Sequence, residues 1–176
     1  MKRFLPLLCA CLALAAVIAV PSAGAKSSKS NKVSAADEQY LQTSISGDRF
    51  EIIGGKLAER KSKNPAVLKL ARTLVSDHSK SLSDAIKLAH ELKIDVPSSP
   101  TPSMIWELKA VSTFKGKAFN HWYSSLEVYD HIQDIDETST EVSNGTNSKV
   151  RDDARTELPM LRKHLRLARA ALAASK

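Results

Sequence analysis

Apolar residues recur every three or four positions over several long stretches of the chain. In the stretch from residue 65 to 93 they share one helix face: Val67, Leu68, Ala71, Leu74, Val75, Leu82, Ala85 and Ala89. A similar stripe runs from Val150 to Leu172. No segment alternates apolar and polar residues for long enough to predict a strand. The pattern therefore predicts an all-α fold.

Capping residues and turn residues divide the chain into long helices. Ser34 is suited to cap the first helix, and Asn64 followed by Pro65 is a strong start for the second. Residues 143–147 have the composition of a turn, after which Ser148 can cap the last helix. The four long helices are expected at about 34–62, 65–93, 117–142 and 148–173.

The connection between the second and third long helices is long and contains three prolines between residues 94 and 102, so it cannot be helical throughout. A short helix from about Ser103 to Lys115, ending at Gly116, is expected to fill the rest of this crossover. The predicted architecture is therefore a four-helix bundle with a short extra helix in the crossover. Core packing is expected for the nearby aromatic residues Trp106, Trp122, Tyr123 and Tyr129.

The first 25 residues have the features of a cleaved signal peptide. Lys2 and Arg3 precede an apolar run over residues 4–20, and small residues lead up to Ala25. Two alternatives are a retained membrane anchor, for which the run is shorter than the usual ~20 residues, and a lipoprotein with a lipidation box at residues 8–11. We expect cleavage after Ala25, a flexible lead-in at 26–33 and one domain at 34–176.

Such a signal places the mature protein in the periplasm or cell envelope, or outside the cell. Cleavage removes both cysteines, Cys9 and Cys11, so the mature chain has no disulfide and no thiolate ligand. It also leaves no apolar run that would span a membrane. The net charge falls from +7 to +5 with the loss of Lys2 and Arg3, too little to predict a nucleic-acid partner.

Polar residues near the middle of each predicted long helix form a candidate site. Glu51 lies 13 residues before Asn64 and His78 lies 14 after it, so at about 1.5 Å per residue both are roughly 20 Å from that turn. His131 lies 14 residues before Gly145, and His164 follows it by 19. One residue from each helix therefore falls near mid-bundle, where bundle proteins build metal sites.

Several motifs resemble those of the bacterial domain-of-unknown-function family 4142. They are Leu74-Val75-Ser76-Asp77-His78, Phe119-Asn120-His121-Trp122-Tyr123, Val128-Tyr129-Asp130-His131 and Leu158-Pro159-Met160-Leu161-Arg162-Lys163-His164-Leu165, together with Glu51 and Lys56-Leu57-Ala58. The resemblance spans roughly residues 35–172 and implies an exported, ferritin-like bundle with no established activity. Two departures are Asn120, where the family usually has Asp, and Glu127, where it often has an apolar residue.

The orientation of the third long helix is open. One orientation points Asp130 into the core and leaves His131 at its edge. The orientation that the resemblance implies turns Glu127 and His131, four residues apart, into the core together. We prefer the second because Val128 and Ile135 then also pack.

The candidate metal ligands are thus Glu51, His78, Glu127, His131 and His164, with Asp77, Asp130 and Glu157 as supporting residues. Imidazole and carboxylate ligands suit iron, zinc, copper or manganese. The Glu-x-x-His motif of ferritin-type di-iron sites is absent, because Val75, Val128 and Leu161 stand three residues before the histidines. The alternative is a hydrogen-bonded polar core without a metal, which fixes the helix register.

Two classes of function follow. One is an exported bundle that binds a transition metal for storage, sensing or stress protection. The other is a non-catalytic envelope protein that acts through its surface, on an envelope protein or a second copy, and whose histidines are structural. No phosphate-binding loop, mature cysteine nucleophile or Ser-His-Asp motif identifies an enzymatic reaction.

Overall fold

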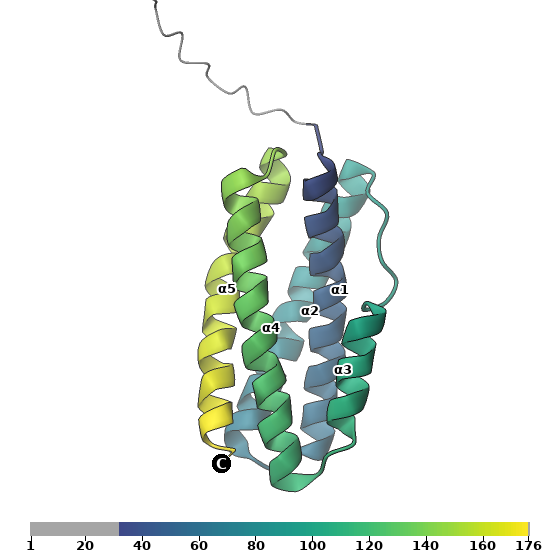
Figure 1. Cartoon of the computed structure of the whole chain (residues 1–176). Coiled ribbons are helices and arrows are strands. Elements are labelled where there is room, and N and C mark those ends of the chain that lie inside the picture. The colour runs from purple at the N-terminus through teal and green to yellow at the C-terminus, as the bar shows by residue number, and fades with distance from the viewer. Residues whose placement is uncertain (1–31, 176) are drawn as a thin grey trace, which may run out of the picture.

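The computed structural model describes residues 32–175, and all regular structure in that range is helical (Figure 1). The helices are α1 (Ala35–Lys61), α2 (Pro65–Leu92), α3 (Pro102–Ser112), α4 (Gly116–Asn144) and α5 (Ser148–Ala173). The prediction of an all-α fold is confirmed. The proposed signal peptide at 1–25, and the lead-in apart from its last two residues, lie outside the described residues. Between residues 32 and 175, no helix has the length and apolar character needed to cross a membrane.

Four long helices lie side by side, and the shorter α3 lies against one end of this bundle (Figure 1). The turn at 62–64 joins α1 to α2, and the turn at 145–147 joins α4 to α5. Across these two hairpins α2 packs on α5 and α1 packs on α4, while α3 contacts α1 and α4. The interior is therefore lined by all four long helices, and a residue from any of them can reach its axis.

The helix starts follow from capping. The side chain of Ser34 accepts a hydrogen bond from the Asp37 amide, and Asp37 accepts one from the Ser34 amide at 2.7 Å, which makes a capping box. Asn64 caps α2 as predicted, and Pro65 is its first residue. For α5 the predicted cap was wrong by one residue: Asn147, not Ser148, accepts hydrogen bonds from the first-turn amides. Both residues can cap, and the turn brings the Asn147 amide oxygen to those donors.

The crossover also differs in detail from the prediction. The short helix α3 ends at Ser112, three residues earlier than expected. Gly116 does not end it but begins α4, with a φ of 55° that favours glycine. Among the aromatic residues expected in the core, only Tyr123 is buried; Trp106 and Tyr129 are 69% and 65% exposed. Trp122 is about half exposed and stacks on Phe114 rather than on the core.

The core consists of two apolar clusters with a polar layer between them. One contains Val67, Leu70, Leu74, Phe119 and Tyr123, and the other contains Leu41, Ile45, Ala85, Ala89 and Ile94. Along α2, His78 lies between Leu74 of the first cluster and Ala85 of the second, and it is only 3% exposed. His90, further along the same helix, is exposed. The polar layer is the candidate site.

Gly55 permits α1 and α2 to approach closely, and we expect Gly55→Ala to be destabilising by about 1–3 kcal/mol. A Cβ at this position would lie 2.7 Å from Val75 Cγ2 and 2.9 Å from the Ala71 carbonyl oxygen, which belongs to the backbone and cannot swing aside. Gly47 on the same helix is the matched control, since a Cβ there meets no atom within 4 Å. Gly47→Ala should stabilise the helix by up to about 1 kcal/mol. Urea denaturation would test the pair, and equal effects of the two substitutions would contradict the close approach.

Candidate metal centre

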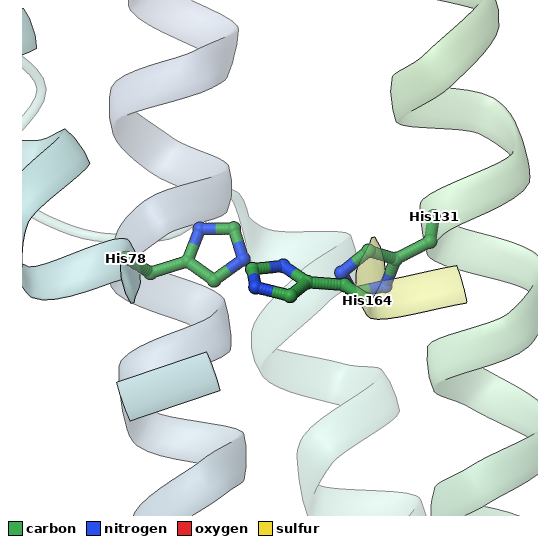
Figure 2. Close-up of side chains that lie close together, drawn as sticks. All are labelled: His78, His131 and His164. Carbon is green, nitrogen blue, oxygen red and sulfur yellow. The ribbon is translucent and has the colours of Figure 1, made fainter. Parts of the chain in front are cut away.

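Three histidines meet in the polar layer between the two apolar clusters (Figure 2). His78 comes from α2, His131 from α4 and His164 from α5, and none is more than 3% exposed. The ring centroids are 5.0 Å apart for His78 and His164, 5.3 Å for His131 and His164, and 6.0 Å for His78 and His131. One ring nitrogen from each lies within 4.8 Å of the other two. We call these residues the histidine triad.

Carboxylates hold two of the three rings. Nδ1 of His78 is 2.7 Å from Oδ1 of Asp48, whose other oxygen accepts a hydrogen bond from the Ser81 hydroxyl at 2.9 Å. Nε2 of His164 is 2.9 Å from Oδ2 of Asp77. Asp77 was predicted as a supporting residue, but it holds the histidine of another helix rather than its neighbour in sequence. This follows from helix geometry, since consecutive residues point about 100° apart.

The third ring is held by its own helix. Nδ1 of His131 is 2.9 Å from the carbonyl oxygen of Glu127, one turn earlier in α4. Each histidine thus has one ring nitrogen engaged, while the other has no hydrogen-bond partner: Nε2 of His78, Nε2 of His131 and Nδ1 of His164. When the engaged nitrogens donate their protons, the three unpartnered nitrogens present lone pairs. Metal-binding histidines are usually oriented in this way, by a carboxylate or carbonyl on the far nitrogen.

The histidine triad is uncharged at neutral pH. Burial lowers the pKa of His78 to about 4 and that of His164 to about 4. Burial, together with the neighbouring histidines, lowers the pKa of His131 to about 3. Protons therefore do not compete with a cation for these nitrogens above about pH 5, and neutral imidazole is the form that binds metals.

Two fully buried glutamates lie on the other side of His131. Its Nδ1 is 3.8 Å from Oε1 of Glu51 and 3.8 Å from Oε2 of Glu127. A ligand atom from each of these three residues again lies within 4.8 Å of the other two, and we call them the carboxylate triad. Burial raises the pKa of Glu127 to about 8. Burial, reinforced by the charges of Glu127 and Asp130, raises the pKa of Glu51 well above its ordinary value.

The five predicted ligands are all buried, but they do not form a single site. They form two sets, and His131 belongs to both. Turn-to-residue spacing predicts height along the bundle, whereas the direction in which each side chain leaves its helix decides which neighbours it meets. The preferred orientation of α4 agrees with the structure, because Glu127 and His131 are both 0% exposed. Asp130 also reaches the edge of the core in this orientation of α4. It lies beside Glu51, and burial raises the pKa of Asp130.

The sequence analysis missed two acidic residues near the site, the buried Asp48 and the half-buried Asp134. Asp48 is 4% exposed, and burial raises its pKa to about 8. Burial also raises the pKa of Asp134 well above its ordinary value, with Asp130 adding to the effect. The position of Asp48 could have indicated its burial. It lies one helical turn before Glu51 on α1, on the face that also carries Gly54 and Gly55.

Glu157, a predicted supporting residue, belongs to neither triad. It lines a small pocket of about 30 Å³ together with Asp48, His78, Asp134 and Tyr40. Burial, with the nearby charge of Asp48, raises the pKa of Glu157 to about 7. The pocket has room for one or two water molecules and borders the histidine triad at His78.

Comparison with known families agrees with the resemblance noted in the sequence. The family described as "Domain of unknown function (DUF4142)" matches residues 22–171, which covers both triads and all five helices up to the last residues of α5. No curated protein and no solved structure is significantly similar to the chain. The match covers well over half of the sequence, and the chain therefore belongs to the DUF4142 family.

Proposed function

We propose that this protein binds a transition-metal ion at the histidine triad, inside a ferritin-like four-helix bundle. Two observations carry the proposal: a ring nitrogen of each histidine lies within 4.8 Å of the other two, and each ring has one nitrogen engaged and the other without a hydrogen-bond partner. Three neutral imidazoles are a donor set that zinc, copper and iron accept, and they leave a further coordination position open. Storage, sensing or stress protection are roles that such a site would serve.

The energetics favour this proposal over a purely structural polar core. A buried polar atom without a partner costs about 1–3 kcal/mol, and the histidine triad contains three such nitrogens. A structural network would be expected to pair these atoms with one another or with the nearby carboxylates. A cation satisfies all three nitrogens at once, and the Asp48 carboxylate on the far nitrogen of His78 offsets part of its charge.

Metal analysis tests the proposal directly. Untagged protein purified without chelator, or reconstituted with Zn²⁺, should contain about one equivalent of metal by mass spectrometry. His131→Ala and His164→Ala should each lower the affinity by at least about 100-fold, because each removes one of three ligands. His90→Ala is the matched control, since His90 is an exposed histidine on α2. Circular dichroism would establish that each variant is folded.

Absence of metal from the wild-type protein, even after reconstitution, would contradict the proposal. The histidines would then be structural, and the function would lie in the surface, as in a non-catalytic envelope protein.

We also propose that residues 1–25 are removed on export and that the mature domain acts in the periplasm or cell envelope. The charged start, the apolar run and the small residues before Ala25 support this. The described helices begin at Ala35, so cleavage at the proposed site would leave the bundle intact. N-terminal sequencing of the protein recovered from cell fractions should find Lys26 first. A cytosolic protein that begins at Met1 would contradict the proposal.

A further inference from the structure

We propose that the carboxylate triad is a second cation site, adjacent to the histidine triad and selective for a harder divalent ion such as Mn²⁺. Its ligands are carboxylate oxygens of Glu51 and Glu127, with Asp130 and the Tyr123 hydroxyl at its edge. This rests on the metal-binding function proposed above, since His131 lies between the two sites: its Nε2 belongs to the histidine triad, and its Nδ1 is 3.8 Å from an oxygen of each glutamate. It differs from that function in assigning two ions per chain and in giving the two positions different chemistry.

The oxygen atoms of this cluster are buried close to one another. No oxygen of Glu51 or Glu127 makes a well-aligned hydrogen bond, and the same holds for Oδ2 of Asp130 and the Tyr123 hydroxyl, although these groups lie close enough to one another to interact. Glu51, Glu127 and Tyr123 are each 0% exposed. Among the described residues no lysine or arginine forms an ion pair with Glu51 or Glu127. Carboxylates buried this close together are strongly unfavourable when ionised, and a cation would supply the missing counter-charge.

The Gly54 backbone lies directly against the cluster. A Cβ at this position would lie 3.2 Å from Cδ2 of Leu108, 3.6 Å from Oε1 of Glu127 and 3.8 Å from a ring carbon of Tyr123. A larger residue at position 54 would therefore crowd the Glu127 carboxylate. The buried Tyr123 hydroxyl lies beside the Glu127 carboxylate without a well-aligned hydrogen bond, so it adds a further oxygen atom at the edge of the cluster.

His131 separates the two positions. Its Nδ1 is 3.8 Å from an oxygen of each glutamate, whereas its Nε2 is the unpartnered nitrogen of the histidine triad. Oxygen ligands suit Mn²⁺ and other hard cations, while imidazole nitrogens suit Zn²⁺ and Cu²⁺. The chain should therefore hold a borderline ion and a harder ion side by side instead of two identical ones.

Sequential loading tests the second site. Metal-free protein would be given one equivalent of Zn²⁺ and then titrated with Mn²⁺, with free Mn²⁺ followed by its electron paramagnetic resonance signal. The wild-type protein should bind one Mn²⁺ per chain while it retains the Zn²⁺. Glu51→Gln and Glu127→Gln should weaken Mn²⁺ binding by at least 100-fold and leave Zn²⁺ binding within a few-fold of wild type. Asp136→Asn, which removes an exposed carboxylate from α4, is the matched control and should change neither.

The outcomes separate this inference from the function proposed above. Zn²⁺ binding with no Mn²⁺ binding would overturn the second site and leave the histidine site in place. Loss of Zn²⁺ in the glutamine variants would also overturn it, because the five residues would then form one site. His78→Ala, which touches only the histidine triad, should lose Zn²⁺ and keep Mn²⁺. Glutamine replaces glutamate with little change of shape, so these variants are expected to fold.

Discussion

Replacing Asp37 by alanine is expected to lower the free energy of unfolding by about 3 kcal/mol or more. The Asp37 carboxylate is 0% exposed and joins the start of α1 to the turn between α4 and α5. It accepts hydrogen bonds from the Ser34 amide and the Thr146 amide, both at 2.7 Å, and from the Asn147 amide at 3.3 Å. Alanine would remove a charged acceptor and leave several donors unsatisfied at once.

The same carboxylate should make stability depend on acid pH. Burial on its own would raise the pKa of Asp37, but hydrogen bonds from Thr146 and Ser34 outweigh it and hold the pKa well below the ordinary value of 3.8. A depressed pKa contributes stability that is present above about pH 4 and is lost as the pH falls below it. The destabilisation caused by Asp37→Ala should therefore shrink toward pH 2.

Urea denaturation at pH 7 and at low pH would measure both effects. Asp84→Ala is a suitable control, because Asp84 is exposed and only pairs with Lys80 and Lys87 on the same helix. Exposed pairs of this kind contribute up to about 1 kcal/mol. An Asp37 variant that lost no more stability than the Asp84 variant would show that the link between α1 and the α4–α5 turn is dispensable.

Saturating Zn²⁺ is expected to raise the stability of the bundle by about 4 kcal/mol when its free concentration is 1,000 times the dissociation constant. At a fixed free Zn²⁺ concentration the gain should be larger at pH 8 than at pH 7. The reason is that the buried carboxylates must lose their protons before they can bind a metal ion or offset its charge.

The direction follows from proton linkage. In the metal-free fold burial raises the pKa of Glu127 to about 8, against an ordinary value of 4.5 in the unfolded chain. The fold therefore holds more protons than the unfolded chain between these values, and its stability falls as the pH rises from 7 to 8. The histidines do not reverse this, because burial lowers the pKa of His78 to about 4, below this range.

Thermal unfolding with Zn²⁺ or with chelator, at the two pH values, would measure the gain. The gap between the midpoints should widen from pH 7 to pH 8 in the wild-type protein and widen less in Glu127→Gln, where Asp48, whose pKa burial raises to about 8, still titrates. A gap that is the same at both pH values in the wild type would show that the carboxylates neither bind nor balance the ion.

The helices and the level of the site were predictable because both depend on local chemistry. Asn64 and Pro65 define a helix start regardless of the rest of the fold, and residue counts from that turn place Glu51 and His78 at one height. What could not be predicted was the direction of each side chain around its helix. This decided that Asp77 meets His164 and that the ligands divide into two sets.

The residues that the sequence analysis missed or misplaced also depend on tertiary contacts. A buried Asp48 resembles any surface aspartate in a sequence until the opposing helix is known to bring His78 and Ser81 to it. The prediction that Trp106 packs in the core was wrong in the opposite direction, because an aromatic residue in an amphipathic segment normally belongs to the core, whereas Trp106 is exposed. Tertiary packing decided both positions.

The two hairpins divide the predicted ligands between them, with Glu51 and His78 on α1–α2 and Glu127, His131 and His164 on α4–α5. Neither hairpin alone carries a complete triad, so an ion at the proposed sites would be held fully only after the two have docked. Such an ion would consequently act late on the folding pathway: it would prolong the lifetime of the native state by slowing unfolding, while the rate at which the chain first collapses would stay the same.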